Sequence, residues 1–151
     1  MTPDPSILEA ALGVLPHGPE FRFLDRLLSL DPGKEAVGEY VVKGDESFLK
    51  GHFPGDPIFP GVLLVEAAAQ LAGVIAQSDP THPPLPGLKL TALNRVKILG
   101  TARPGETLRI EASLSGRFGM LVQSEARVLV ADRVVLSLSL TLAGTELPLN
   151  R

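Results

Sequence analysis

The sequence predicts an α+β domain in which a curved antiparallel sheet wraps around one long apolar helix. Glu66 is the only formally charged side chain between Ile58 and Gln77, and a helix so apolar must be covered on most of its sides. Beyond that helix the chain holds three or four long strand-like segments separated by short turn signals. A sheet built from those strands can cover the helix, and this combination favours the α+β class.

The composition is that of an ordinary globular protein. The 151 residues, 1–151, suit a single domain and are enough to bury roughly two-thirds of the surface of the unfolded chain. Hydrophobic residues make up 44% and charged residues 21% of the chain. Aromatic residues make up only 5%, so aliphatic packing must dominate the core.

Charge and cysteine content exclude several classes of function. The formal net charge of −3 offers no basic field for a nucleic acid or an anionic membrane, so neither is an expected partner. The chain has no cysteine, which excludes disulfides, thiolate catalysis and metal sites built on cysteine. The N-terminal residues 1–6 contain acid and proline where a signal peptide would be basic and then apolar, so we expect a cytoplasmic protein.

The first elements are expected to be a short helix and a β-hairpin. The helix is predicted over residues 6–12, capped by Ser6. Two strands, over residues 21–30 and 36–43, are predicted to pair across an Asp-Pro-Gly turn. The next segment, residues 44–60, is rich in glycine and proline. Because proline cannot donate a ladder hydrogen bond, we expect irregular backbone there.

The central helix is expected to begin at Pro60 and Gly61 and to run to about Gln77. Proline suits the first helical turn, where its missing N–H is no loss. The length approaches that of a membrane span, but Glu66 and Gln70 interrupt the apolar run, so a buried helix in a water-soluble protein is the better interpretation. Strong helix formers with small side chains would let a sheet approach closely, and these are the alanines at positions 67, 68, 69, 72 and 76.

A proline-rich loop over residues 79–87 follows the helix, and the rest of the chain is predicted to be mainly strand. The last segment alternates apolar and polar residues with the period of two that is typical of a half-buried surface. Turn signals separate the expected strands, which lie at about residues 88–99, 107–117, 121–130 and 133–143.

The residues with the clearest chemical potential lie just before and inside the central helix. His52 sits in a segment stiffened by prolines, which can hold an imidazole in one orientation, and histidine can accept a proton at neutral pH. Glu66 is a lone carboxyl among apolar residues, where burial favours the protonated form that can donate. Gly61 begins the helix, so its N–H and the positive end of the helix dipole could polarise a carbonyl oxygen.

Together these groups supply a base, an acid and a carbonyl-polarising donor, the set needed to abstract a proton α to a carbonyl and expel a β-hydroxyl. Gln70 lies one turn beyond Glu66 on the same helix face and could orient its carboxyl. On these residues alone the plainer interpretation stays open. A loop histidine is usually structural or solvated, a helix glutamate is usually solvated, and the glycines and prolines could simply mark turns.

The same segment resembles the signature of the 3-hydroxyacyl-(acyl-carrier-protein) dehydratases of the FabZ type. That family has a G-H-F-P-G motif, a P-G pair and an E-A-x-A-Q helix in this order and spacing, and residues 51–55, 60–61 and 66–70 match them. Upstream, residues 15–17 and 24–26 resemble its L-P-H and V-D-R elements. The resemblance extends over most of the chain, from about residue 15 to residue 143.

This resemblance implies a hotdog fold and a homodimer, alone or in a trimer of dimers, in which the histidine of one subunit works beside the glutamate of the other. Carried over to this chain, His52 would be the base at the α-carbon. Glu66 would protonate the departing hydroxyl, and the Gly61 N–H would hold the thioester oxygen. No metal or other cofactor is implied, because loss of water changes no oxidation state. The residues implied to support the site are Gln70, Phe53 and Pro54.

The resemblance also implies acyl carrier protein as the partner that delivers the acyl chain. The basic patch expected to meet this acidic partner is reduced here, because Leu99 and Gly100 replace basic residues that are usual in the family. The remaining basic candidates for the patch are Lys50, Arg95, Lys97 and Arg22.

A sibling family, which also isomerises the new double bond, shares part of the motif. Residues 55–57 follow the pattern of that family, whereas Glu66 stands where it has aspartate, so we expect the class that does not isomerise. Two other interpretations of the fold stay open: a thioester hydrolase and a non-catalytic acyl-binding subunit. Of the remaining histidines, His17 is interpreted as structural and His82 as exposed.

Overall fold

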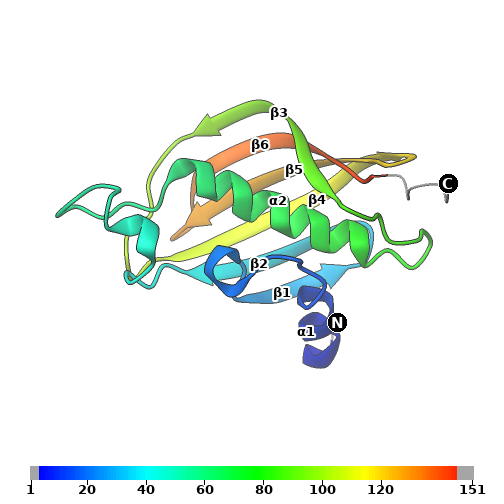
Figure 1. Ribbon diagram of the computed structural model, residues 1–151, viewed down its shortest axis with the longest axis horizontal. Coiled ribbons are helices and arrows are strands. Elements are labelled where there is room, and N and C mark those ends of the chain that lie inside the picture. The colour runs from blue at the N-terminus through cyan, green and yellow to red at the C-terminus, as the bar shows by residue number, and fades with distance from the viewer. Residues whose placement is uncertain (1–3, 146–151) are drawn as a thin grey trace, which may run out of the picture.

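The computed structural model describes residues 4–145, and the order of its elements can be followed in Figure 1. The elements are α1 (Pro5–Leu12), η1 (Pro19–Phe21), β1 (Arg26–Asp31), β2 (Glu35–Val41), η2 (Ser47–Leu49), α2 (Gly61–Gln77), β3 (Lys89–Ile98), β4 (Thr107–Phe118), β5 (Leu121–Val130) and β6 (Arg133–Ala143), where η marks a short 3₁₀ helix.

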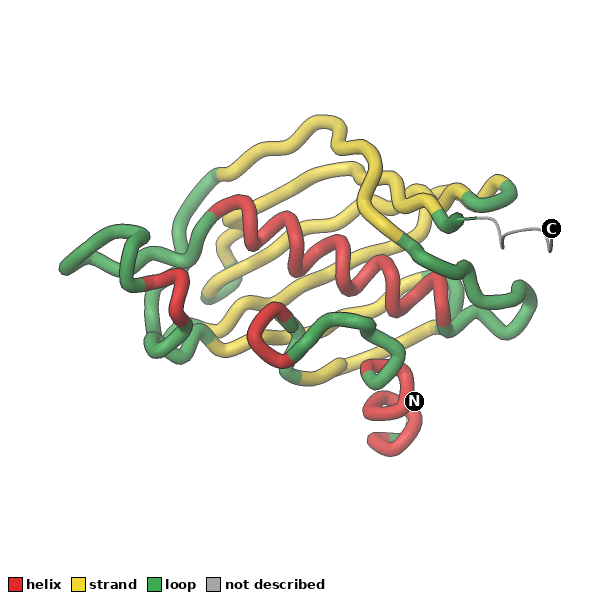
Figure 2. Tube along the Cα trace, in the orientation of Figure 1, coloured by secondary structure: helices red, strands yellow, loops and turns green. Residues whose placement is uncertain are grey.

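The strands form one antiparallel sheet in the order β1-β2-β4-β5-β6-β3. The sheet curves around α2, which lies across its inner face (Figures 1 and 2). This is the hotdog arrangement that the family resemblance implies, so the predicted α+β class is confirmed. The predicted bounds of the central helix and of the last two strands also match α2, β5 and β6.

Small side chains let the helix and the sheet approach each other. Ala36, Ala112, Ala126 and Leu138 are partners across four neighbouring strands, and each is at most 8% exposed. Since successive strand residues point to opposite faces, this buried row faces α2 while the charged residues beside it face outwards. On the helix side, the alanines that were expected to permit close approach are all buried.

Most of the few aromatic residues gather in one cluster next to the beginning of α2, whereas Phe118 lies exposed at the end of β4. Phe23 is 1% exposed, and its ring centroid lies 5.7 Å from that of Tyr40, 5.9 Å from Phe48 and 5.8 Å from Phe59. Aromatic pairs of this kind contribute ~0.5–1.5 kcal/mol each beyond the area they bury. The cluster therefore ties the segment before β1 to the loop that precedes the helix.

The first strand is shorter than predicted, because β1 begins at Arg26 instead of residue 21. A side chain of the central helix takes the hydrogen bonds that a strand would need there. Gln70 accepts the backbone N–H of Phe23 (2.9 Å) and donates to the carbonyl of Phe21 (2.8 Å). The predicted strand over the earlier residues is therefore wrong, and the segment is irregular with one 3₁₀ turn.

The cap of α1 also differs from the prediction. The N-cap is Asp4, whose carboxylate accepts the backbone N–H of Ser6 over 2.9 Å. Pro5 occupies the first helical position, where proline is favourable, so the helix begins before Ser6 and the predicted cap there is wrong. None of the helices among residues 4–145 combines the length and the hydropathy needed to cross a membrane.

One edge of the sheet is uncovered in the single chain. β3 pairs with β6 on one side, and no strand among the described residues pairs with its other side. Leu93, Val96 and Ile98 of β3 are exposed by 42%, 38% and 53%. An uncovered edge that carries apolar side chains is a ready surface for another chain.

Candidate active site

Glu66 projects from α2 into a polar cluster that holds one of its carboxyl oxygens. Gln70 Nε2 donates to Glu66 Oε2 over 2.9 Å, and His17 Nε2 lies 3.3 Å from the same oxygen. The side chain of Glu66 is 23% exposed although the helix around it is buried. The carboxyl is therefore held in place and can still be reached from solvent.

Gln70 ties this carboxyl to the segment before β1. It is 2% exposed, and its amide nitrogen donates both to Glu66 and to the carbonyl of Phe21, while its oxygen accepts the N–H of Phe23. A side-chain amide has two N–H donors, and here both have partners, so the orientation of the group is determined.

His17 belongs to the same cluster, although the sequence was interpreted as giving it a structural role. Its side chain is 28% exposed, and its ring stacks against that of Phe21 with the centroids 6.3 Å apart. The L-P-H element marks this histidine in the sequence. Spacing alone gives no sign that it meets Glu66, which lies in a different element and far along the chain.

Arg22 holds the His17 segment in position. Its Nη2 donates to the carbonyl of Leu15 over 3.1 Å and to the carbonyl of His17 over 3.3 Å, on either side of Pro16. Leu15 is itself buried. The guanidinium therefore anchors the backbone that carries the imidazole of His17 to Glu66.

His52 is held by its own loop. Its Nδ1 lies 2.9 Å from the carbonyl oxygen of Ile58, and the N–H of Ile58 donates back to the carbonyl of His52 over 2.7 Å. A carbonyl can only accept, so in the neutral ring Nδ1 carries the hydrogen and Nε2 keeps a lone pair. The ring of Phe53 stacks on the imidazole with the centroids 4.4 Å apart. The loop thus selects the tautomer whose Nε2 can take up a proton.

The tip of the His52 loop is a tight turn. Phe53 and Asp56 exchange two backbone hydrogen bonds around Pro54, over 3.1 and 2.9 Å. The carboxylate of Asp56 pairs with Arg103 in the turn before β4. Phe53, Pro54 and this ion pair therefore restrain the backbone next to the imidazole.

The helix begins at Gly61, directly after Pro60. The first N–H groups of a helix have no partner within it, so the N–H of Gly61 lies unpaired by the helix at the positive end of its dipole. A side chain here would displace Ile98 of β3, because a Cβ on Gly61 would lie 2.9 Å from Cδ1 of that isoleucine. Glycine thus lets the edge strand pack against the beginning of the helix.

The two proposed proton-transfer groups are not joined within a single chain. Among the contacts of residues 4–145, the imidazole of His52 bonds to Ile58, whereas Glu66 bonds to Gln70 and His17. No contact of those residues links His52 to Glu66. In the same part of the chain, no three histidine, aspartate or glutamate side chains converge as ligands for a metal ion.

A cavity of about 500 Å³ opens beside Glu66 and runs along α2. Glu66, Gln70, Gly73 and Gln77 line it from the helix, because residues three or four apart share one face. At the far end, Gln77 exchanges two hydrogen bonds of 2.7 and 2.8 Å with the backbone of Leu85. The apolar wall opposite the helix consists of Leu85, Leu88, Leu90 and Leu142.

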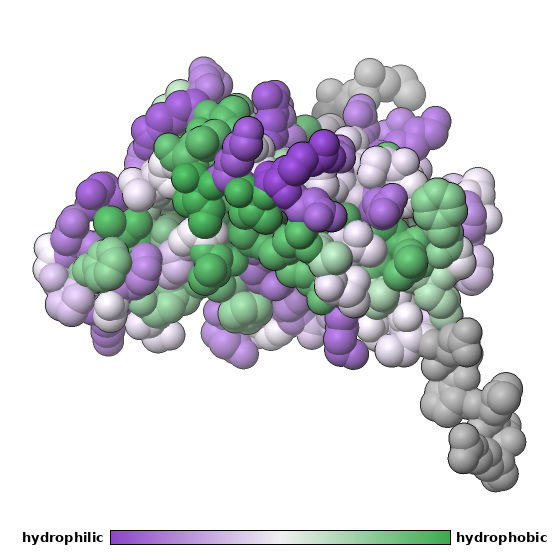
Figure 3. Space-filling model, turned by 90° about the horizontal axis from the view of Figure 1, so that it is seen from above, coloured by the Kyte–Doolittle hydropathy of each residue, from purple (hydrophilic) through white to green (hydrophobic). Residues whose placement is uncertain are grey.

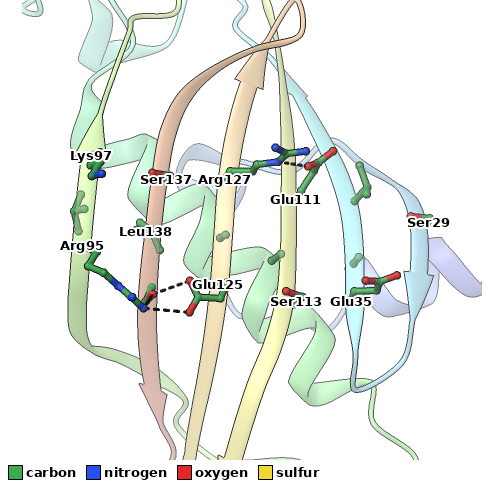
Figure 4. A pocket seen from close by; sticks show the side chains of 16 residues that line it. Ser29, Glu35, Arg95, Lys97, Glu111, Ser113, Glu125, Arg127, Ser137 and Leu138 are labelled. Atoms are coloured by element: carbon green, nitrogen blue, oxygen red, sulfur yellow. Dashed lines mark hydrogen bonds and ion pairs between the residues drawn. The ribbon is translucent and has the colours of Figure 1, made fainter.

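A larger groove, of about 700 Å³, lies on the outer face of the sheet, away from α2 (Figure 4). Serines line it together with charged residues that neutralise one another. Arg127 pairs with Glu111 over 2.5 Å, and Arg95 lies 3.6 Å from Glu125. In this groove charged side chains and serines stand between the apolar ones, whereas the cavity beside Glu66 has a wall of leucines, so that cavity is the better candidate for an apolar ligand.

The four basic residues predicted to meet a carrier protein lie at different places. Arg95 and Lys97 line the groove on the outer face (Figure 4). Arg22 lines a cleft near the N-terminal segment and is half-buried. Lys50 is exposed, two residues before His52. Of the four, Lys50 lies nearest in the chain to a candidate catalytic group.

Glu46 fixes the loop that leads from β2 towards His52. It accepts the hydroxyl of Tyr40 and the N–H of Gly44, both over 2.6 Å, and the N–H of Lys43 over 3.2 Å. Burial works to raise the pKa of Glu46, but the hydrogen bonds outweigh it and hold that pKa below its usual range. Burial and the adjacent carboxylate together raise the pKa of Tyr40 well above its usual value.

Comparison with known proteins points in one direction. The chain matches the family described as FabA-like domain over residues 15–139. It is 37% identical over 139 residues to the 3-hydroxyacyl-(acyl-carrier-protein) dehydratase FabZ of Chloroflexus aggregans, covering 92% of this chain and 96% of that protein. The protein of the same name from Herpetosiphon aurantiacus is 36% identical over 128 residues, which cover 85% and 90% of the two chains.

Solved structures are similar in fold. The dehydratase heterocomplex ApeI:P from Xenorhabdus doucetiae aligns with a TM-score of 0.73 and 18% sequence identity, over 87% of this chain and 88% of that chain. At this level of identity the likeness supports the hotdog fold and nothing beyond it.

Glu46 is expected to make the stability of the protein depend on pH. Because its pKa is lowered on folding, its hydrogen bonds contribute stability above the unfolded value of 4.5, and this contribution is lost as the pH falls through the folded value. We expect Glu46→Gln to lower the free energy of unfolding by about 1–3 kcal/mol at neutral pH. The decline of stability below ~pH 5 should become shallower in this variant, as measured by urea unfolding at a series of pH values.

The matched control is Glu9→Gln, at an exposed position in α1, which should leave both the stability and its pH dependence unchanged. An equal pH dependence in Glu46→Gln and in the wild type would show that the Glu46 carboxylate does not couple folding to protons.

Proposed function

Because the chain belongs to the FabA-like domain family, we propose that it dehydrates 3-hydroxyacyl thioesters on acyl carrier protein to trans-2-enoyl thioesters, a step of fatty acid biosynthesis. The observation that carries the mechanism is the 2.9 Å contact between His52 Nδ1 and the carbonyl oxygen of Ile58. Since that oxygen can only accept, the hydrogen is assigned to Nδ1, and Nε2 can accept a proton. An imidazole held in this way is oriented to remove a proton from the α-carbon.

Three groups carry the reaction. His52 Nε2 removes the proton from the α-carbon, while the N–H of Gly61 donates to the thioester oxygen, where negative charge develops. Glu66 gives its proton to the β-hydroxyl, which leaves as water as the C–O bond breaks and the double bond forms. His52 ends with one proton more and Glu66 with one fewer, and a proton transfer through water restores both. Carbon and oxygen undergo no net redox change, so the mechanism uses no redox cofactor.

The working unit of this proposal is a homodimer in which His52 of one chain acts beside Glu66 of the other. Two features support it. No contact among the described residues joins the two groups within one chain, and the edge strand β3 exposes a row of apolar side chains. Figure 3 looks onto the β3 side of the molecule, where hydrophobic residues gather in a broad band. Three such dimers could assemble further into a hexamer.

The acyl chain is proposed to lie in the cavity beside Glu66. Its wall of leucines matches an alkyl chain, and its mouth is at the carboxyl that would protonate the leaving group. The carrier protein would then remain outside, where Lys50 can meet its acidic surface. Such a carrier-linked reaction is expected in the cytoplasm.

A thioester hydrolase and a non-catalytic acyl-binding subunit are the alternatives on this fold. A hydrolase would use a base to activate water and would release the free acid. A binding subunit would retain the cavity without turnover. The products formed from one set of substrates distinguish the three.

The first prediction concerns turnover of a 3-hydroxyacyl thioester on carrier protein. We expect reversible loss of water that falls by about 10²–10⁴-fold in His52→Ala and in Glu66→Gln, because each removes one proton-transfer group. His82→Ala is the control, since His82 is exposed in the loop after α2. Full activity of His52→Ala would refute the mechanism, free acid would identify a hydrolase, and a shifted double bond would identify the isomerising class.

Mixing the two inactive variants tests whether the site is shared between chains. Random exchange makes about half of the dimers heterodimers, each with one complete site of two, so about a quarter of the wild-type activity should return. The measurement is activity after subunit exchange, with each variant alone as control. No recovery, despite heterodimers seen by native mass spectrometry, would place both groups of a site in one chain.

The second prediction concerns the depth of the cavity at Gly73. A Cβ there would lie 3.9 Å from Leu88 Cδ2 and 4.0 Å from Leu142 Cδ1, which is ordinary contact, so alanine fits and a larger side chain fills the cavity. We expect Gly73→Leu to lower kcat/KM for long-chain substrates by about 10–100-fold, and for the shortest ones far less. Gly73→Ala is the matched control and should keep the chain-length profile. Equal losses at all lengths in Gly73→Leu would contradict this location of the acyl chain.

The third prediction concerns the carrier protein. We expect Lys50→Glu to raise KM for carrier-linked substrate about 10-fold at low salt and less at high salt, because the contact is electrostatic. KM for a small uncharged thioester analogue should not change. Lys34→Glu, at an exposed turn between β1 and β2, is the control with the same charge change. An unchanged ratio of the two KM values in Lys50→Glu would remove Lys50 from the patch.

A further inference from the structure

The cluster around Glu66 contains a second histidine, His17, whose two ring nitrogens have unequal surroundings. Nε2 lies 3.3 Å from Glu66 Oε2. Nδ1 is buried, and no atom of the described residues forms a hydrogen bond with it. A hydrogen on Nδ1 would be a buried donor without a partner, which is costlier than an unpaired acceptor. Of the two neutral tautomers, these surroundings therefore favour the one with the hydrogen on Nε2.

Two nitrogens consequently lie close to one carboxyl oxygen. Gln70 Nε2 donates a hydrogen bond of 2.9 Å to Glu66 Oε2, and His17 Nε2 lies 3.3 Å from the same oxygen, at ion-pair distance. An oxygen that accepts one hydrogen bond and has a second nitrogen donor this close is the less favourable place for a proton. When Glu66 is protonated, its hydrogen is therefore on Oε1.

We propose that His17 is a positioning residue for the dehydration: with Gln70 it holds Glu66 Oε2, so that Oε1 carries the proton delivered to the departing hydroxyl. This inference rests on the proposed function, in which Glu66 is the acid. His17 itself transfers no proton in the reaction and acts through the carboxyl of Glu66.

The anchoring of His17 supports this role. Arg22 binds the carbonyl oxygens of Leu15 and His17, so the backbone is held on both sides of Pro16. Phe21 stacks against the imidazole, and the carbonyl of Phe21 is itself bound by Gln70. The short segment from His17 to Phe21 thus connects the two side chains that contact Glu66, those of His17 and Gln70.

Other ionisable groups near the carboxyl are few. Lys89 lines the same cavity from the beginning of β3, and Arg22 is engaged with backbone carbonyls. Among the described residues, the direct polar contacts of Glu66 are with His17 and Gln70. Loss of the His17 imidazole should therefore directly change how the Glu66 carboxyl is held.

His17→Leu tests the inference, because it keeps an apolar side chain at the site and removes the donor. We expect kcat to fall by about one to two orders of magnitude, since misplacing a reacting group by ~1 Å can cost ~10²-fold, with little change in KM. The alkaline limb of the pH–rate profile should move to higher pH, because one donor that favours the ionised carboxylate is gone. His17→Gln, which retains an N–H donor, should recover part of kcat and return the limb towards the wild type.

His82→Leu is the matched control. His82 is also a histidine beside a carboxylate, that of Asp79, but it lies exposed in the loop after α2. It should leave kcat and the pH profile unchanged. Wild-type kcat and a wild-type alkaline limb in folded His17→Leu would overturn the inference.

A measurement on the unmutated protein covers the case in which His17→Leu does not fold. Nitrogen-15 NMR of the histidine rings reports which nitrogen carries the hydrogen. We expect a hydrogen on Nε2 of His17, and a change of its Nε2 signal in Glu66→Gln. A His17 ring whose only hydrogen is on Nδ1 would overturn the inference.

Failure of the inference can be told from failure of the proposed function. If the wild type shows no dehydration or hydration, or if Glu66→Gln is fully active, the proposed function itself fails. If Glu66→Gln is inactive while His17→Leu behaves as the wild type, only the role of His17 fails.

Discussion

The amide of Gln70 connects the polar groups on which the site depends. It is buried in an otherwise apolar helix, where an unpaired amide would be costly, and it finds its partners in the backbone of Phe21 and Phe23 and the carboxyl of Glu66. The bonds therefore do two things at once. They hold the segment before β1 against the helix, and that segment places His17 beside the carboxyl of Glu66. The hydrogen bonds of Gln70 thus determine both the path of this segment and the orientation of Glu66.

The two histidines show how backbone and burial choose a tautomer. A carbonyl oxygen beside Nδ1 of His52 favours a hydrogen on that nitrogen, which leaves Nε2 available for the base role proposed for it. For His17, Nδ1 is buried without a partner among the described residues and Nε2 faces a carboxyl, which favours the hydrogen on Nε2 and suits the ring to the positioning role proposed for it. The same side chain is thus suited to opposite roles because its neighbours differ.

Sequence patterns predict helices and strands whose hydrophobic periodicity is strong and that pack against other helices and strands. The apolar helix and the alternating strand β6 were predicted with their bounds, because helix propensity and pleat spacing are local properties. The predicted strand over residues 21–30 is wrong in residues 21–25, because the competing hydrogen bonds come from Gln70, 47 residues from Phe23 in the chain. The contact of His17 with Glu66 escaped prediction for the same reason. Long-range contacts made by side chains have no period in the sequence.

The beginning of α2 and the uncovered edge of the sheet cannot be treated as independent. Ile98 lies at the end of β3, and its side chain packs against Gly61, where a Cβ would come within 2.9 Å of its Cδ1. The helix N–H proposed to hold the thioester oxygen therefore lies beside the strand that also offers its free edge to a second chain. A chain that pairs with β3 would restrict the same isoleucine, and with it the approach to the helix N-terminus. In the proposed dimer, assembly and the surroundings of the carbonyl-binding donor would thus be coupled through one apolar contact.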